Sequence, residues 1–468
     1  MSPPMPRAPE GRQWPWGLII VAMIIPMIGV ANLYSAAQNY FETDIWWKQV
    51  IWATAGFTIA FFVARLKPTT IELTAWPAYI VTCILLVLVL AIGVPIKGAQ
   101  RWLDLGFFNM QPSELAKLAM MLVVARYFST FEMSGGYTLL ALLRPLNPSR
   151  PLGLLALQAY RMYDQRKDLV RAFKRDGLEP PTFDAAIEAA RALTSPGVEV
   201  TKELAGVDDA WVLPAVIAVS IVWLLVAVVV LIRRGVHHRA IVAPLDIVVV
   251  PFVLVLIEPD LGTSSIVLGI AATQILFAGM RWRDLVISAA SGLGMAWYAW
   301  TNLLHDYQRK RIETFLNPEA DIQGSGYHAA QSIIAVGSGQ VTGKGWGEGT
   351  QTQLSFLPEN HTDFAFSVLG EEWGFVGVTV LIVCFLTLVA LMLRAASKAT
   401  DRFSALLAVG AAAMIFWHAF INIGMVTGVL PVVGVTLPLV SYGGSSMITK
   451  LLAVGFAVNA HVHARRSQ

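Results

Sequence analysis

The sequence is poor in charge and nearly free of cysteine. Charged residues make up 14% of its 468 residues, whereas a soluble domain carries about 25%. This shortage argues against an ordinary soluble domain, and no nucleic-acid-binding signature is present. The two cysteines, Cys83 and Cys384, both lie within apolar runs. They argue against a disulfide framework or a cysteine metal cluster and favour buried free thiols.

Apolar residues are abundant instead, at 56% of the chain. Several windows reach the roughly 20 residues that a helix needs to cross a bilayer, and the first is too long for a cleaved signal peptide. We therefore expect an all-α, polytopic integral membrane protein. The apolar windows lie near 17–36, 47–64, 74–94, 113–128, 211–232, 241–257, 264–279, 283–300, 365–394, 403–423 and 444–460.

Basic residues in the loops predict one orientation, because short cytoplasmic loops are enriched in Lys and Arg. With both termini in the cytoplasm, the inward residues are Arg7, Arg12, Arg65, Lys67, Arg281, Arg283, Arg394, Lys398, Arg402, Arg465 and Arg466. The outward loops are then 37–46, 95–112, 258–263, 301–364 and 424–443.

The polar segment 129–210 does not fit this alternation. The fourth span should end inside, yet Arg233 and Arg234 after the window 211–232 also favour the inside. Either part of 136–160 crosses the membrane or 211–232 does not fully span it. A cytoplasmic helical hairpin, a docking element and an extra crossing all remain open for this segment.

Two outward stretches could bind an anion. Arg309, Lys310 and Arg311 form a basic triplet, which is either a solvated charge run or a phosphate site, since arginine matches phosphate oxygens. The stretch GSGQVTGKGWGEGT contains Lys344 but does not match the phosphate-loop pattern. It is either a plain mobile loop or a flexible loop that offers backbone N–H groups to a ligand.

Ionisable residues also lie within the expected spans. Glu114 and Lys117 are three residues apart on one helix face. They form either a structural ion pair or part of a polar site, because such groups at membrane depth usually face a polar cavity. Glu371 and Glu372 enter the ninth span, and at least one should point inward, toward Lys117 or Arg101.

Asp363 lies in the stretch FLPENHTDFAF, directly before an apolar run. Thr362 or Asp363 could cap the helix that follows. The carboxylate could also accept a proton from an attacking hydroxyl, while nearby arginines steady a departing phosphate. The local sequence allows both roles.

Long stretches of the chain resemble the SEDS family (shape, elongation, division and sporulation), and its elongation-type RodA branch more than its FtsW division branch. The matching stretches are RWLDLGFFNMQPSELAKLA (101–119), EPDLGTS (258–264), HDYQRKRIETFLNPEAD (305–321), QSIIAVGSGQVTGKGWGEGTQTQLSFLPENHTDFAFSVLGEEWG (331–374) and NIGMVTGVLPVVGVTLPLVSYGGSS (422–446).

The resemblance implies about ten transmembrane helices and a peptidoglycan glycosyltransferase in the bacterial inner membrane, with its active site facing the periplasm. The implied substrate is lipid II, and the implied partners are a class B penicillin-binding protein and the elongation machinery. The catalytic aspartate of the family's HTDF motif corresponds to Asp363. A divalent cation, Mg or Mn, would be held through the substrate pyrophosphate.

The expected substrate-binding residues are Arg101, Glu114, Lys117, Arg309, Arg311, Lys344, His361, Glu372 and Ser441. The expected regions are 1–128 and 211–300 with membrane helices, 129–210 as a polar insertion, 301–364 as the outward loop with the catalytic motif, and 365–468 with the last membrane helices.

Two other functions stay open: a lipid II flippase, and a non-catalytic scaffold for the penicillin-binding partner. The outward position of the charged residues and the lack of a visible inverted repeat favour the enzyme. The chain departs from the family at Glu258, where glutamine is common, and in the insertion 129–210 with the span 211–232.

Overall fold

The computed structural model describes residues 14–37, 44–96, 99–104, 106, 109–130, 136–138, 141–142, 244–258, 260–302, 309, 315, 325–354, 356–357 and 359–464. Contacts divide the chain into two units, Met1–Leu140 with Pro244–Gln468, and Ala141–Ala243. All elements named below belong to the first unit.

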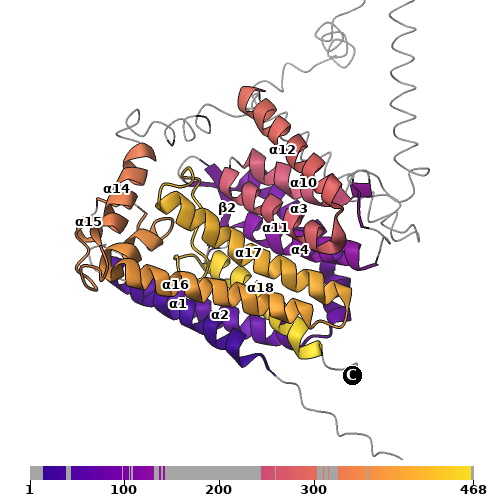
Figure 1. Cartoon of the computed structure of the whole chain (residues 1–468), viewed down its shortest axis with the longest axis horizontal. Coiled ribbons are helices and arrows are strands. Elements are labelled where there is room, and N and C mark those ends of the chain that lie inside the picture. The colour runs from indigo at the N-terminus through magenta and orange to yellow at the C-terminus, as the bar shows by residue number, and fades with distance from the viewer. Residues whose placement is uncertain are drawn as a thin grey trace, which may run out of the picture. The chain divides into compact units, whose positions relative to one another are not determined.

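Helices dominate this unit (Figure 1). They are α1 (Trp16–Ala36), α2 (Ile45–Arg65), α3 (Pro68–Ile92), α4 (Pro112–Thr130), α10 (Pro244–Ile257), α11 (Leu261–Gly279), α12 (Trp282–Asn302), α14 (Ser325–Ser338), α15 (Thr350–Gln353), α16 (Ala365–Ser397), α17 (Arg402–Val426) and α18 (Gly444–His463). Among the described residues, six helices are long and apolar enough to cross a membrane: α1, α2, α3, α11, α16 and α17. The expected polytopic helical class is confirmed.

A small antiparallel sheet lies in the expected outward loop 95–112, where the sequence predicted only a loop. Its strands β1 (Val94–Ile96), β2 (Ala99–Asp104) and β3 (Asn109–Met110) are paired in chain order. The sheet fixes the backbone of Arg101 in the segment that leads into α4.

The core surrounds α17, the most buried of the six candidate spans, which packs against α16, α18, α11 and α4. Close packing of α2 on α18 depends on glycine. A Cβ at Gly56 would lie 2.6 Å from Leu451, and a Cβ at Gly455 would lie 2.9 Å from the Ala60 Cα. Small residues at such contacts allow two membrane helices to approach closely.

The helix α16 is broken near its start. Gly374 has a φ of 60°, which is not helical and which favours glycine. Gln340 and Val341 accept hydrogen bonds from the N–H groups of the next two residues, Phe375 and Val376, at 2.8 and 3.1 Å. The break separates a short first helix from the long apolar remainder, so Glu371 and Glu372, which were expected within the ninth span, precede its long helix.

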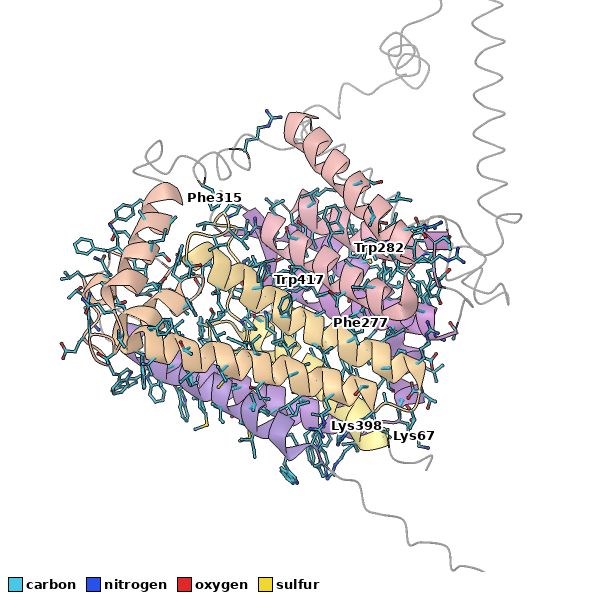
Figure 2. The ribbon with its side chains drawn as sticks, in the orientation of Figure 1. Lys67, Phe277, Trp282, Phe315, Lys398 and Trp417 are labelled. Atoms are coloured by element: carbon cyan, nitrogen blue, oxygen red, sulfur yellow. The ribbon has the colours of Figure 1, made fainter. Side chains whose placement is uncertain are left out.

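The basic turns gather at one end of the bundle, as the expected orientation requires. Figure 2 shows Lys67 and Lys398 at the same end. At the start of α17, the Arg402 guanidinium donates to the Ala278 carbonyl at 2.7 Å. Tyr137, which follows α4, pairs with Met280 in a β-bridge beside this turn. The two alternatives for 129–210 fall almost wholly outside the described residues.

Candidate functional site

Four ionisable side chains meet between α4, α17 and α18, and we call them the charge cluster: Glu114, Lys117, His418 and Lys450. The Lys117 Nζ lies 2.7 Å from the Glu114 Oε1 and 2.8 Å from the His418 Nε2. The Lys450 Nζ lies 3.3 Å from the Glu114 Oε2. All four residues are at most 5% exposed.

Hydrogen bonding fixes the form of His418. A lysine ammonium only donates, so the His418 Nε2 accepts from Lys117. The other ring nitrogen, Nδ1, then carries the proton and donates to the Met414 carbonyl at 2.7 Å. This histidine is neutral. The charge cluster therefore holds two ammonium groups and a single carboxylate.

Sequence reasoning found half of this cluster. The contact between Glu114 and Lys117 follows from their spacing on one helix, and the structure contains it. His418 and Lys450 were missed, although both lie inside expected spans. Their ionisable side chains at membrane depth were the signal that could have found them.

Asp363 lies in the turn before α16 and is half-buried. The N-cap residue of α16 is Phe364, which makes no side-chain capping hydrogen bond, and not Thr362 or Asp363. Instead, the Asn422 side-chain amide donates to the Asp363 carbonyl at 2.8 Å and to the Val435 carbonyl at 2.6 Å. Asn422 of α17 thereby fastens Asp363 to the loop 431–443.

The same loop approaches the Asp363 carboxylate from another side. Gly434 has a φ of 72°, and a Cβ there would lie 3.5 Å from the Asp363 Oδ2. The Tyr442 N–H donates to the His361 carbonyl at 2.9 Å, and the two rings lie 6.4 Å apart. The loop 431–443 thus contacts both His361 and Asp363, and a shared role for them in one site stays a prediction.

Arg101 of β2 joins the small sheet to the turn between α10 and α11. Its Nε donates to the Glu258 carbonyl at 2.9 Å, and a terminal guanidinium nitrogen lies 3.7 Å from the Asp260 Oδ2. Asp260 also caps α11 by accepting from the Thr263 N–H at 3.0 Å. A role for Arg101 in binding phosphate stays a prediction.

Glu258 is the departure from the family pattern, and its carboxyl group is fully buried. Within the described part of the chain, neither carboxyl oxygen has a hydrogen-bond partner. Burial raises the pKa of Glu258 well above its ordinary value, the Asp260 charge raises this pKa further, and the Arg101 guanidinium lowers it. The site therefore favours the protonated acid.

The glycine-rich stretch is tied to α16 through Glu371. The buried Glu371 Oε1 accepts from the Lys344 Nζ at 2.7 Å and from the Gln351 N–H at 2.9 Å. The N–H groups of Lys344 and Gly345 donate to the carbonyls of Glu371 and Glu372 at 3.0 and 3.1 Å. These two backbone groups are engaged within the fold, so they are not offered to a ligand.

Glu372 turns to the opposite neighbour, α1. Its Oε1 accepts from the Ser35 hydroxyl, and no described residue donates a hydrogen bond to its buried Oε2. The expectation that Glu371 or Glu372 would point toward Lys117 or Arg101 is wrong, because Glu371 meets Lys344 and Glu372 meets Ser35.

The remaining expected residues are spread over several places. The Ser441 Oγ accepts from the Leu437 N–H at 2.9 Å within its own turn. Arg309 is half-buried, and Arg311 lies outside the described residues. The substrate-binding roles of these residues, and those of His361, Lys344 and Glu372, stay predictions.

In the part of the chain that the structure describes, no group of three His, Cys, Asp or Glu side chains could hold a metal ion. A divalent cation held through a substrate's phosphate oxygens stays a prediction.

The family model FTSW_RODA_SPOVE, described as "Cell cycle protein", matches residues 13–146 and 213–466. Residues 147–212 fall outside this match, whereas most of the window 211–232 falls inside it.

Three relatives illustrate the likeness. Peptidoglycan glycosyltransferase MrdB of Escherichia coli strain K12 is 34% identical over 410 residues, which cover 88% of this chain and 84% of that protein. A probable peptidoglycan glycosyltransferase FtsW of Trichlorobacter lovleyi is 31% identical, over 95% of this chain and 92% of that protein. A solved structure of a peptidoglycan synthase complex that coordinates polymerization and crosslinking contains a chain with a TM-score of 0.63 and 25% identity, covering 97% of this chain and 99% of that chain.

Proposed function

Because the chain belongs to the FTSW_RODA_SPOVE family of cell cycle proteins, we propose that it is a peptidoglycan glycosyltransferase that polymerises lipid II during cell elongation. Relatives that bear the name peptidoglycan glycosyltransferase align over most of its length. MrdB and the FtsW protein have similar identity to this chain, so the elongation role rests on the HDYQ stretch before the basic triplet.

The observation that carries the proposal is the environment of Asp363. A buried amide, Asn422, holds its backbone against the loop 431–443, and Gly434, which has no side chain, lies next to its carboxylate. A general base must be positioned before it can take a proton. These contacts support Asp363 in that role.

The reaction follows from a single base. Asp363 takes the proton of the acceptor N-acetylglucosamine 4-hydroxyl, and that oxygen attacks C1 of the donor N-acetylmuramic acid. The bond from C1 to the pyrophosphate oxygen breaks, and undecaprenyl pyrophosphate leaves. An α-linked phosphosugar becomes a β-1,4 link, so one displacement with inversion suffices and no covalent enzyme intermediate is needed.

Cationic residues on the outward side would hold the pyrophosphate. Arg101, Arg309 and Arg311 supply guanidinium groups that match phosphate oxygens. Lys117, in the buried charge cluster, is the fourth candidate. A Mg or Mn ion bound to the same oxygens would neutralise part of the leaving group's charge.

The test is polymerisation of lipid II by the purified protein, under moenomycin to silence contaminating polymerases of another type. Asp363→Asn keeps the shape but removes the base, and it should lower turnover by about 100- to 10,000-fold. Asp401→Asn is the matched control, because Asp401 caps α17 by accepting from the Ser404 N–H at 2.7 Å. An Asp363→Asn protein with wild-type turnover would refute the assignment of the base, whereas a wild-type protein that makes no polymer would favour the flippase or scaffold.

The partner and setting follow from the same function. A neighbour in a solved peptidoglycan synthase complex supports association with a class B penicillin-binding protein. We place the protein in the bacterial inner membrane with Asp363 on the periplasmic side, opposite the basic turns around Lys398 and Arg402. In a depletion strain, rescue of rod shape would support the elongation role, and rescue of division alone would refute it.

A further inference from the structure

The charge cluster has an excess of positive charge. Lys117 and Lys450 share one carboxylate, Glu114, and both lysines are fully buried. His418 is neutral, so it supplies no counter-charge. Buried charges in proteins are normally paired, because an unpaired one loses its hydration without compensation. Among the described residues, one ammonium group therefore lacks an anion of its own.

Lys450 directs its charge toward the outward side through Ser446. The two residues are one turn apart on α18, and the Lys450 ammonium donates to the Ser446 Oγ. Ser446 is half-buried, near the helix start, whereas Lys450 is fully buried. A serine oxygen that accepts a hydrogen bond keeps its own proton to donate.

Ser446 lies beside the loop that contacts the proposed base. Its Oγ is 3.3 Å from the Thr436 Oγ1. Thr436 is two residues along the chain from Gly434, which lies next to the Asp363 carboxylate. An anion bound at Ser446 would thus lie beside the loop 431–443, which also contacts the Asp363 carboxylate.

We propose that the Ser446 hydroxyl, polarised by Lys450, donates to a phosphate oxygen of the diphosphate leaving group. Ser446 is the binding residue and Lys450 is a positioning residue that acts through it. The inference deepens the proposed function and rests on it, because the diphosphate belongs to that substrate.

The chemistry favours an anion over a neutral group. The hydrogen bond from an ammonium group to a hydroxyl strengthens the hydroxyl's own donation, because linked hydrogen bonds polarise one another. A charged acceptor makes the second bond charge-assisted, and such bonds are about twice as strong as neutral ones. A diphosphate also offsets the unpaired charge of the charge cluster.

The test measures binding and not turnover, with the protein in lipid nanodiscs. The probes are undecaprenyl pyrophosphate and undecaprenol, which share the lipid tail and differ in the diphosphate. The variants are Ser446→Ala, Lys450→Gln and the double variant. Lys398→Gln is the matched control, since Lys398 is an exposed lysine after α16 at the basic end.

For the wild type, undecaprenyl pyrophosphate should bind more tightly than undecaprenol. Each single variant should lower that preference by about 10-fold or more, the value of a hydrogen bond to a charged group. The double variant should lower it no further, because the two residues act as one unit. Affinity for undecaprenol and the control should not change.

The inference would be overturned by an equal preference in wild type and Lys450→Gln, or by losses that multiply in the double variant. An equal loss for both probes would show a structural role and would also overturn it. None of these results depends on polymerisation, so the proposed function can fail or hold separately.

Discussion

Replacing Glu114 by glutamine tests the charge cluster most directly, because both buried lysines depend on this carboxylate. The Glu114 oxygens lie 2.7 Å from the Lys117 Nζ and 3.3 Å from the Lys450 Nζ, and they accept from the Thr449 hydroxyl at 2.9 Å. Removing one partner of a buried ion pair costs about 3–5 kcal/mol. We expect Glu114→Gln to lower the free energy of unfolding by at least this amount, a large share of a total of about 5–15 kcal/mol.

Removing Lys450 should have the opposite sign. Lys450→Met leaves one carboxylate with one ammonium group, so the excess charge disappears. Replacing buried charge by apolar atoms is often neutral or stabilising. The double variant Glu114→Gln/Lys450→Met leaves one unpaired ammonium group on Lys117 in place of two, and its stability should lie between those of the single variants.

The assay is equilibrium unfolding of the purified protein in detergent, followed by tryptophan fluorescence. We expect Lys450→Met to be at least as stable as the wild type, followed by the double variant and then Glu114→Gln. Lys398→Met controls for loss of an exposed lysine and should match the wild type. A Glu114→Gln protein as stable as the wild type, or a Lys450→Met protein less stable than the double variant, would refute the charge count.

Three further predictions concern the outward elements. Glu371→Gln removes the charge that binds Lys344. Tryptic cleavage at Lys344 should then be faster by about 10-fold or more, the equivalent of one charged hydrogen bond. An unchanged cleavage rate would show that this ion pair does not hold the glycine-rich stretch. The pKa of Glu258 is raised in the folded protein, so the protonated acid contributes its whole stabilising effect below the unfolded-state pKa of about 4.3. This contribution to the free energy of unfolding is lost as the pH rises through the pKa of the folded state. Glu258→Gln should therefore unfold later than the wild type at pH 8, with a gap that closes toward pH 4, and a gap independent of pH would count against burial of the acid. Gly374→Ala adds a Cβ 2.3 Å from a backbone nitrogen at a φ of 60° and should lower the free energy of unfolding by about 1–3 kcal/mol or more, whereas Gly292→Ala, which meets no atom within 4 Å, should not.

The membrane helices could be predicted because their signal is local. The windows 365–394 and 403–423 correspond to α16 (Ala365–Ser397) and α17 (Arg402–Val426). They could be found because a membrane-spanning helix requires about 20 consecutive apolar residues. The break at Gly374 was missed. It depends on the carbonyls of Gln340 and Val341 in the glycine-rich stretch, which precedes α15 in the chain.

The site likewise contains residues that the local sequence predicted and contacts that it could not predict. Glu114 and Lys117 could be paired from their spacing on one helix, and Asp363 was identified through its HTDF motif. The partners of Glu371 and Glu372 could not be predicted, because Ser35 is separated from Glu372 by 337 positions. An ionisable residue inside an apolar segment indicates that its side chain needs a partner, but the local sequence does not identify that partner.

The sequence by itself determined the class of molecule, its helical spans and the acid before α16, because hydropathy and short motifs are properties of neighbouring residues. The tertiary structure decided which charges meet. Lys450 reaches Glu114 across 336 positions, and His418 reaches Lys117 across 301. Only the packing of α4, α17 and α18 brings these groups together. Their charges interact strongly there because water is excluded from that contact.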